Sequence, residues 1–254
     1  MSTTHEQAIL DQFTRQAIPF STSPSIKDEI ALNLLIQAAG AGPNDTVLDV
    51  ACGPGLVVCA FAKVVAHATG IDITPAMLDR ARQLQAERGS TNVTWKLGDV
   101  TSLPFPDASF SIVTSRFAFH HVLDPAAVLG EMKRVCKPGG KVVVADSAPA
   151  ADKVDAFNAV EKLRDPSHVR ALTLAEHTSL FARHGLGEPR HTPYRLESDL
   201  ESLLARSFPN PGNADKIRAA FRRSVEDDSL GIAARSEGDR VIYGYPIAIL
   251  VADR

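Results

Sequence analysis

The chain has 254 residues, of which 44% are hydrophobic and 22% are charged, and its formal net charge is −3. A chain of this size can bury one substantial core and carry an appended lid, which disfavours two independent domains. Basic residues are interspersed with acidic ones along the chain. This pattern lacks the positive patch that a phosphate backbone requires, so nucleic acid is disfavoured as a partner.

The sequence also bears on the compartment. No basic segment followed by an apolar stretch opens the chain, and no apolar run approaches the roughly 18 residues that a membrane span needs. Cys52, Cys59 and Cys136 form no metal-like pair, and an odd, sparse count suits a reducing compartment. We therefore expect a soluble, cytoplasmic protein without membrane insertion and without a metal, acting as a monomer or a homodimer.

Residues 1–40 are expected to form an N-terminal helical cap. Their pattern predicts a helix over 7–17, a break at 19–25 that is rich in Pro and Ser, and a second helix over 26–39. In an α/β fold, ligands bind at the carboxyl ends of the strands, and additions of this kind usually cover that edge. The cap is therefore interpreted as part of a substrate lid, and peripheral packing or a dimer surface is the alternative.

Residues 41–150 alternate short apolar runs with segments of helical length, which is typical of parallel strands joined by crossover helices. The predicted fold class is α/β: a doubly wound, mostly parallel, seven-stranded sheet of the Rossmann-like type. This region is interpreted as the cofactor-binding core. Its five strands are expected at 46–51, 68–73, 93–97, 110–115 and 141–145.

Three predicted helices have clear boundary signals. Proline in the first turn after a polar residue, a capping box and a terminal glycine are typical helix ends. The helices run from Thr74-Pro75 to Gly89, from Asp124-Pro125 to Cys136, and from the capping box of Thr173 and Glu176 to a position near Gly185.

The C-terminal half, 151–254, carries a predicted helical insertion around 197–235, which a loop at 208–213 interrupts. We assign this insertion to the substrate lid as well. The β-rich run 240–252 is predicted to form the last strand, antiparallel and at the edge of the sheet. The whole chain, 1–254, is interpreted as a single domain.

The most informative stretch is 47–55, VLDVACGPG, in which an apolar run ends in two glycines. Glycines after a buried strand let a ligand approach the backbone closely. Asp72 follows Gly53 by about twenty positions, at the end of the next predicted strand, where a carboxylate can accept hydrogen bonds from ribose hydroxyls. The pattern predicts a βαβ unit that binds an adenosine-containing molecule.

A dinucleotide is less consistent with this motif. The dinucleotide fingerprint needs a third glycine three positions after the second, and this position is Val58. Residues 56–61 offer no Lys, Ser or Thr to a phosphate at the start of the next helix. We therefore favour a ligand with a ribose and an amino-acid tail, and an NAD-dependent oxidoreductase is the alternative.

Four motifs follow one another within residues 45–150. They read VLDVACGPG, GIDITPAMLDRAR, LGDVTSLPFPDASFSIVTS and RVCKPGGKVVVAD. In this order they resemble the class I S-adenosylmethionine-dependent methyltransferases, in the ubiquinone/menaquinone-biosynthesis-like branch (methyltransferase type 11). One departure is Ala51, where the family often has glycine. Beyond residue 150 the chain resembles uncharacterised bacterial members that share the stretch 164–170, RDPSHVR.

The resemblance implies S-adenosyl-L-methionine as the cofactor and S-adenosyl-L-homocysteine as the product. It assigns Asp49 to the methionine part, Asp72 to the ribose hydroxyls and Asp99 to the adenine amino group. The residues implied to bind the cofactor are Asp49, Ala51, Gly53, Gly55, Asp72, Ile73, Met77, Asp99, Val100 and Ser115.

Candidate catalytic residues follow the predicted fourth strand, at the edge where the cofactor is expected. Arg116 can orient an anionic or carbonyl-bearing acceptor, and His120 or His121 can remove a proton near neutral pH. The alternative for the adjacent histidines is to cap the next helix or to line the cofactor pocket. His168 is a further catalytic candidate.

Substrate contacts are expected from the two lid regions and from Arg116. Arg170 is expected to close the pocket together with His168, and a surface turn is the alternative for both. Phe13 and Phe20 can shield a sulfonium by cation–π contact, and core packing is the alternative.

The sequence thus predicts an enzyme, independent of metal, that transfers a methyl group from S-adenosylmethionine to a small-molecule acceptor held under a helical lid. In-line displacement of this kind depends mainly on positioning and desolvation. The acceptor atom stays open among O, N, C and S. A protein that binds S-adenosylmethionine without transferase activity is the second alternative.

Overall fold

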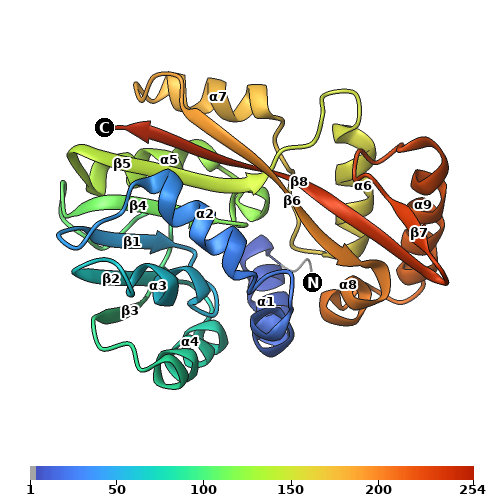
Figure 1. Cartoon of the computed structure of the whole chain (residues 1–254), viewed down its shortest axis with the longest axis horizontal. Coiled ribbons are helices and arrows are strands. Elements are labelled where there is room, and N and C mark those ends of the chain that lie inside the picture. The colour runs from blue at the N-terminus through green and yellow to red at the C-terminus, as the bar shows by residue number, and fades with distance from the viewer. Residues whose placement is uncertain (1–3) are drawn as a thin grey trace.

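A computed structural model describes residues 4–254, and an open sheet of eight strands runs through it (Figure 1). Seven strands form the continuous order β3-β2-β1-β4-β5-β8-β6, and the short β7 pairs with β8. β1 to β5 pair in parallel, whereas β8 runs antiparallel to β5 and β6. The predicted α/β class with a mostly parallel sheet is confirmed. The strands are β1 Thr46–Val50, β2 His67–Asp72, β3 Val93–Leu97, β4 Phe110–Arg116, β5 Cys136–Ser147, β6 Arg190–Asp199, β7 Arg235–Glu237 and β8 Arg240–Asp253.

Helices pack on both faces of the parallel strands and gather again at the far ends of β6 and β8. In Figure 1 this second group consists of α6, α8 and α9. Apolar clusters join α5 and α7 to one face of the sheet, α2 and α3 to the other, and α6, α8 and α9 to β8. The helices are α1 His5–Thr22, α2 Glu29–Ala39, α3 Leu56–Phe61, α4 Pro75–Arg88, α5 Pro125–Val135, α6 Val154–Arg164, α7 Leu174–Arg183, α8 Leu200–Ser207 and α9 Asn213–Asp227, with the 3-10 helix η1 Phe119–His121.

Most boundary signals of the core helices act as predicted, although the side chain of Thr74 makes no capping hydrogen bond at the start of α4. Asp124 accepts hydrogen bonds from two backbone N–H groups at the start of α5, which satisfies donors that the helix leaves free. Thr173 and Glu176 form the capping box of α7. α4 ends at Gly89, whose φ of 65° lies in the left-handed region that glycine adopts readily. Among residues 4–254, no helix has the length and apolar character required to cross a bilayer.

β8 is a central strand, which corrects the prediction that residues 240–252 form the edge. It pairs with β5 on one side and with β6 on the other, and most of its residues are buried. The edge is β6, which has no counterpart among the predicted strands. Pro193 and the exposed positions of β6 suit an edge, because proline cannot donate a hydrogen bond to a further strand.

α1 continues into the break predicted at 19–25 and ends at Thr22. Pro19 lies near the C-terminal end of the helix, where it removes only one backbone hydrogen bond. The hydroxyl groups of Ser21 and Thr22 both donate to the carbonyl of Ile18, which satisfies an acceptor at this helix end.

Polar contacts fix α1 between two parts of the structure. On one side, Arg80 of α4 donates from Nε to Oγ of Ser21 at 2.8 Å. On the other side, Gln16 Nε2 donates to Oδ2 of Asp165 at 3.2 Å, and Gln12 donates to a backbone carbonyl at the end of α8. α1 therefore lies beside the ends of the parallel strands, between α4 and α8 (Figure 1).

Candidate active site

The turn after β1 folds as its glycines predict. Ala51, Gly53 and Gly55 have φ values of 58°, 50° and 79°, all in the left-handed region. Glycine adopts this region freely, whereas the Cβ of an alanine is crowded there. The turn leads directly into α3, and it carries its backbone N–H groups to the carboxyl end of the sheet.

Gly55 also has no room for a side chain. A Cβ at this position would lie 2.5 Å from Cη2 of Trp95 and 2.9 Å from Cβ of Ala81. The turn therefore packs directly against β3 and α4, and its shape depends on the close approach that glycine permits.

Asp72 joins this turn to the start of α4. Its Oδ2 accepts from the backbone N–H of Gly53 and its Oδ1 from that of Thr74, both at 2.8 Å. Burial raises the pKa of this carboxyl, and the N–H partners offset part of the effect. An ionised carboxylate has about four acceptor sites, so both oxygens can accept a further hydrogen bond.

Asp49 and Arg116 are buried groups of opposite charge with unused hydrogen-bonding atoms. Asp49 is 1% exposed, and its Oδ1 has no partner among residues 4–254. Burial raises the pKa of Asp49 well above its usual range, although Arg116 acts in the opposite direction. Arg116 donates from Nη1 to the carbonyl of Ile26 at 3.0 Å, whereas its Nε and Nη2 lack partners in the same part of the chain.

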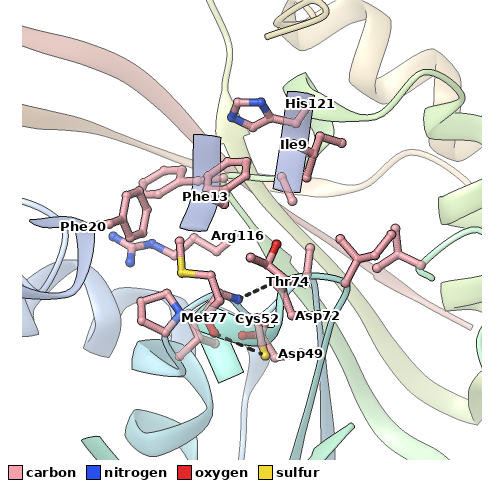
Figure 2. Close-up of a pocket in the computed structure, with 18 of the residues that line it drawn as sticks. Ile9, Phe13, Phe20, Asp49, Cys52, Asp72, Thr74, Met77, Arg116 and His121 are labelled. Atoms are coloured by element: carbon pink, nitrogen blue, oxygen red, sulfur yellow. Dashed lines mark hydrogen bonds between the residues drawn. The ribbon is translucent and has the colours of Figure 1, made fainter. Parts of the chain in front are cut away.

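These groups line a cavity at the carboxyl ends of β1, β2 and β4, which we call the edge cavity (Figure 2). Its empty space, mouth included, measures about 820 Å³, which is in the range of small-molecule sites. Figure 2 shows Phe13 of α1 and His121 across the cavity from Asp49 and Asp72. The cavity therefore combines an acidic floor with an aromatic wall.

A second cavity adjoins the first and lies among α1, α6, α8 and β8. This α8 cavity holds about 590 Å³ of empty space. Phe13, Phe20, Phe117 and His121 line both cavities and so form the boundary between them. Two molecules, one in each cavity, would meet at these four side chains.

His120 lines the α8 cavity and is held by Asp146 at the end of β5. Its Nδ1 lies 2.5 Å from Oδ1 of Asp146, whose Oδ2 accepts from the backbone N–H of Phe119. Burial alone would lower the pKa of His120, but the charge and hydrogen bond of Asp146 outweigh it and raise that pKa. Burial would raise the pKa of Asp146, but the same contact holds it below its usual range.

His121 and His168 are neutral at physiological pH. Burial, together with the charge of His120, lowers the pKa of His121 to about 4 and that of His168 to about 3. His121 Nδ1 lies 3.1 Å from Oγ of Ser167, and His168 Nε2 lies 2.7 Å from Oδ1 of Asn158. His168 lies behind the cavities rather than in their walls, so the structure does not bring it to the site as predicted.

Most of the predicted cofactor residues meet in the edge cavity. Those that line it are Asp49, Ala51, Gly53, Asp72, Ile73, Met77 and Val100, together with the predicted substrate or catalytic residues Arg116, Phe13, Phe20 and His121. Gly55 and Ser115 lie just behind the cavity wall, and Ser115 Oγ donates to the carbonyl of Val50 at 2.8 Å.

Asp99 and Arg170 point elsewhere. Asp99 is exposed, and its carboxylate accepts from the backbone and the hydroxyl of Thr101, in a turn that places Val100 at the cavity. Arg170 reaches neither cavity, because its Nη2 forms a partly exposed ion pair with Oε1 of Glu176 at 3.0 Å. This corrects its predicted place at the substrate pocket.

Several site residues were missed by the sequence reasoning. Asp146 directly follows the predicted strand 141–145, and this position at the carboxyl edge could have indicated it. No comparable signal marks Glu161 or Arg206, because α6 and α8 reach the cavity only through long-range packing. Arg164 belongs to the stretch 164–170 noted for its resemblance, but nothing in that stretch assigned it to the site. Within residues 4–254 no group of three His, Cys, Asp or Glu side chains could hold a metal ion.

Comparison with known proteins identifies the family. A family model described as a methyltransferase domain matches residues 48–144. The uncharacterized methyltransferase YcgJ of Bacillus subtilis (strain 168) is 36% identical over 200 residues, which cover 78% of this chain and 79% of that protein. The chain belongs to the class I S-adenosylmethionine-dependent methyltransferases. The resemblance of its motifs to this family is confirmed.

Two further relatives refine the placement of this methyltransferase. The ubiquinone/menaquinone biosynthesis C-methyltransferase UbiE of Shewanella halifaxensis is 37% identical over 122 residues, which cover 46% of this chain and 49% of that enzyme. The crystal structure of Bacillus YcgJ aligns with a TM-score of 0.80 at 27% identity, over 89% of this chain and 98% of that one. The methyltransferase is thus of the UbiE-like branch, with the Rossmann-like fold of its relatives and S-adenosylmethionine as its cofactor.

The packing of the turn can be tested with two glycine variants. Gly55→Ala is expected to lower the free energy of unfolding by about 2–5 kcal/mol, since it adds both left-handed strain and overpacking. Gly89→Ala is the matched control, because its φ of 65° is similar but no heavy atom lies within 4 Å of the added Cβ. It should cost only about 1–2 kcal/mol. Equal losses in urea unfolding would contradict the close packing of the turn.

Proposed function

We propose that this methyltransferase holds S-adenosylmethionine in the edge cavity and methylates a small molecule held in the α8 cavity. Its unused buried charges support this placement. The cofactor carries an ammonium and a carboxylate on its methionine part, and Asp49 and Arg116 offer a free acceptor and free donors of the matching signs. Buried charges are costly without partners, so a ligand with both charges would stabilise this cavity.

Other residues that line the edge cavity supply the remaining proposed contacts with the cofactor. We propose that Asp72 accepts hydrogen bonds from the ribose hydroxyls through the acceptor sites that its two N–H partners leave free. Ile73, Met77 and Val100 supply apolar contacts for ribose and adenine. In this assignment Arg116 serves the cofactor rather than the acceptor, because it lines the edge cavity and not the α8 cavity.

The two cavities support a division of labour within the chain. We propose a single domain in which residues 41–150 carry the cofactor, while the cap at 1–40 and the insertion around 197–235 close the acceptor site. α1 and α8 line the α8 cavity, and Gln12 links them directly. Phe13 and Phe20 keep the boundary between the cavities apolar, which excludes water from the transfer.

The cofactor supplies an electrophilic methyl group when it is bound. The chain's own contribution is to hold the acceptor at the boundary between the cavities and to take its proton where it has one. We propose His120 as this base. Asp146 fixes its Nδ1, so Nε2 is left to accept the proton, and the imidazolium that forms is stabilised by the Asp146 carboxylate.

Binding of the cofactor product tests the placement in the edge cavity. S-adenosylhomocysteine is expected to bind, and Asp72→Ala should weaken this binding about tenfold or more, because hydrogen bonds to a charged group are lost. Isothermal titration measures both, with thermal unfolding to confirm that the variant folds. Asp79→Ala is the control, because Asp79 is an exposed carboxylate of α4 paired with Arg82. Unchanged affinity in Asp72→Ala, or binding of NAD in place of the product, would overturn the assignment.

The His120–Asp146 pair predicts a titration. In nuclear magnetic resonance of the full chain, His120 should titrate above the ordinary histidine value of about 6.5. In Asp146→Asn its pKa should fall below that value, because burial remains and the compensating charge is gone.

The raised pKa of His120 also predicts how the free energy of unfolding depends on pH. Because His120 binds its proton more tightly in the folded chain than in the unfolded chain, the stabilisation is complete at pH below about 6.5 and is lost as pH rises through the raised pKa. A His120 pKa that Asp146→Asn leaves unchanged would rule out the pair as a positioned base.

A further inference from the structure

Arg206 of α8 is a buried cation without an acidic partner. The residue is 9% exposed and lines the α8 cavity. Its two polar contacts are with neutral hydroxyl groups, Oγ of Ser198 and the phenol of Tyr243, both at 3.4 Å. No carboxylate lies within 4.0 Å of its guanidinium in the described part of the chain, residues 4–254. A guanidinium has five N–H donors, so most of its donors are unused.

The acidic residues of the same cavity do not pair with Arg206. Glu161 accepts from Nε and Nη2 of Arg164 and from the phenol of Tyr245, so both its oxygens are occupied. Asp165 accepts from Gln16 and from the backbone and hydroxyl of Ser167.

The arginine of this network is occupied as well. Arg164 lies between the two acids, 2.7 Å from Glu161 and 3.8 Å from Asp165. Glu161 and Asp165 thus pair with Arg164 in one network of two negative charges and one positive charge. Among residues 4–254 neither acid contacts Arg206, which lines the same cavity without an acid beside its guanidinium.

Part of the wall of the α8 cavity is apolar. Ile26, Leu196 and Leu203 line it together with the phenylalanines shared by both cavities. His120, the proposed base, belongs to the same wall. The α8 cavity therefore combines a cationic side chain, an apolar wall and a base.

We infer that the methyl acceptor is a small anion, a carboxylate or a phosphate ester with an apolar body, whose oxyanion pairs with Arg206. This inference rests on the proposed function, since it names the class of molecule that occupies the α8 cavity. A planar guanidinium binds such oxyanions through two parallel hydrogen bonds. The anion would supply the contacting oxyanion that Arg206 lacks among residues 4–254, and the apolar body would extend toward the boundary side chains.

Direct binding to the full chain saturated with S-adenosylhomocysteine tests this inference. The probes are 3-phenylpropanoate and phenyl phosphate, with 3-phenylpropanamide as the neutral counterpart, and isothermal titration measures each. At least one anionic probe is expected to bind about tenfold or more tightly than the amide. Arg206→Gln should remove this preference, whereas Arg206→Lys, which keeps the charge but loses the fork, should retain part of it.

The matched control is Arg218→Gln, because Arg218 is an arginine of α9 engaged with Glu201 and Asp215 outside the cavity. It should leave the preference intact. Binding of S-adenosylhomocysteine is measured in the unaltered chain and in every variant. If the unaltered chain does not bind this product, the proposed function is overturned instead. Product binding without preference for either anion, or a preference that Arg206→Gln leaves unchanged, would overturn the inference. The two anionic probes distinguish a carboxylate from a phosphate site.

Discussion

The architecture of the site depends on one interaction, the acceptance of two backbone N–H groups by the buried carboxylate of Asp72. One N–H comes from Gly53 in the turn after β1 and the other from Thr74 at the start of α4. A single side chain thus joins the turn after β1 to the junction between β2 and α4. Because both carboxylate oxygens retain acceptor sites, the group that builds the turn also presents the proposed ribose contact.

The buried charged groups fall into two sets, those that pair with another group of the chain and those that are free to contact a ligand. Glu161 with Arg164, and His120 with Asp146, satisfy each other within the fold. Asp49, Arg116 and Arg206 keep polar atoms or a whole charge unmatched, and all three line a cavity. Since an uncompensated buried charge is unfavourable, these positions are where bound molecules would contribute most. Asp49 and Arg116 suit a zwitterionic ligand, and Arg206 suits an anionic one.

The sequence predicted the parts that local chemistry specifies. The glycine turn, the acid after β2 and the caps of α5 and α7 each depend on residues close in the chain. Long-range packing decided the rest. β6 carries a proline and exposed positions that hide its strand character, so β8 was predicted as the edge. The lid around 197–235 was predicted, but Glu161 and Arg206 were not, because α6 and α8 reach the cavity only after the chain has folded around β8.

The most direct test of the central claim is a crystal structure of the full chain with S-adenosylhomocysteine. The account predicts the ribose at Asp72, the amino-acid part between Asp49 and Arg116, and the sulfur directed toward His121 and the α8 cavity. A product molecule lying in the α8 cavity, or one whose sulfur points away from the shared boundary, would contradict the division of the site into a cofactor cavity and an acceptor cavity.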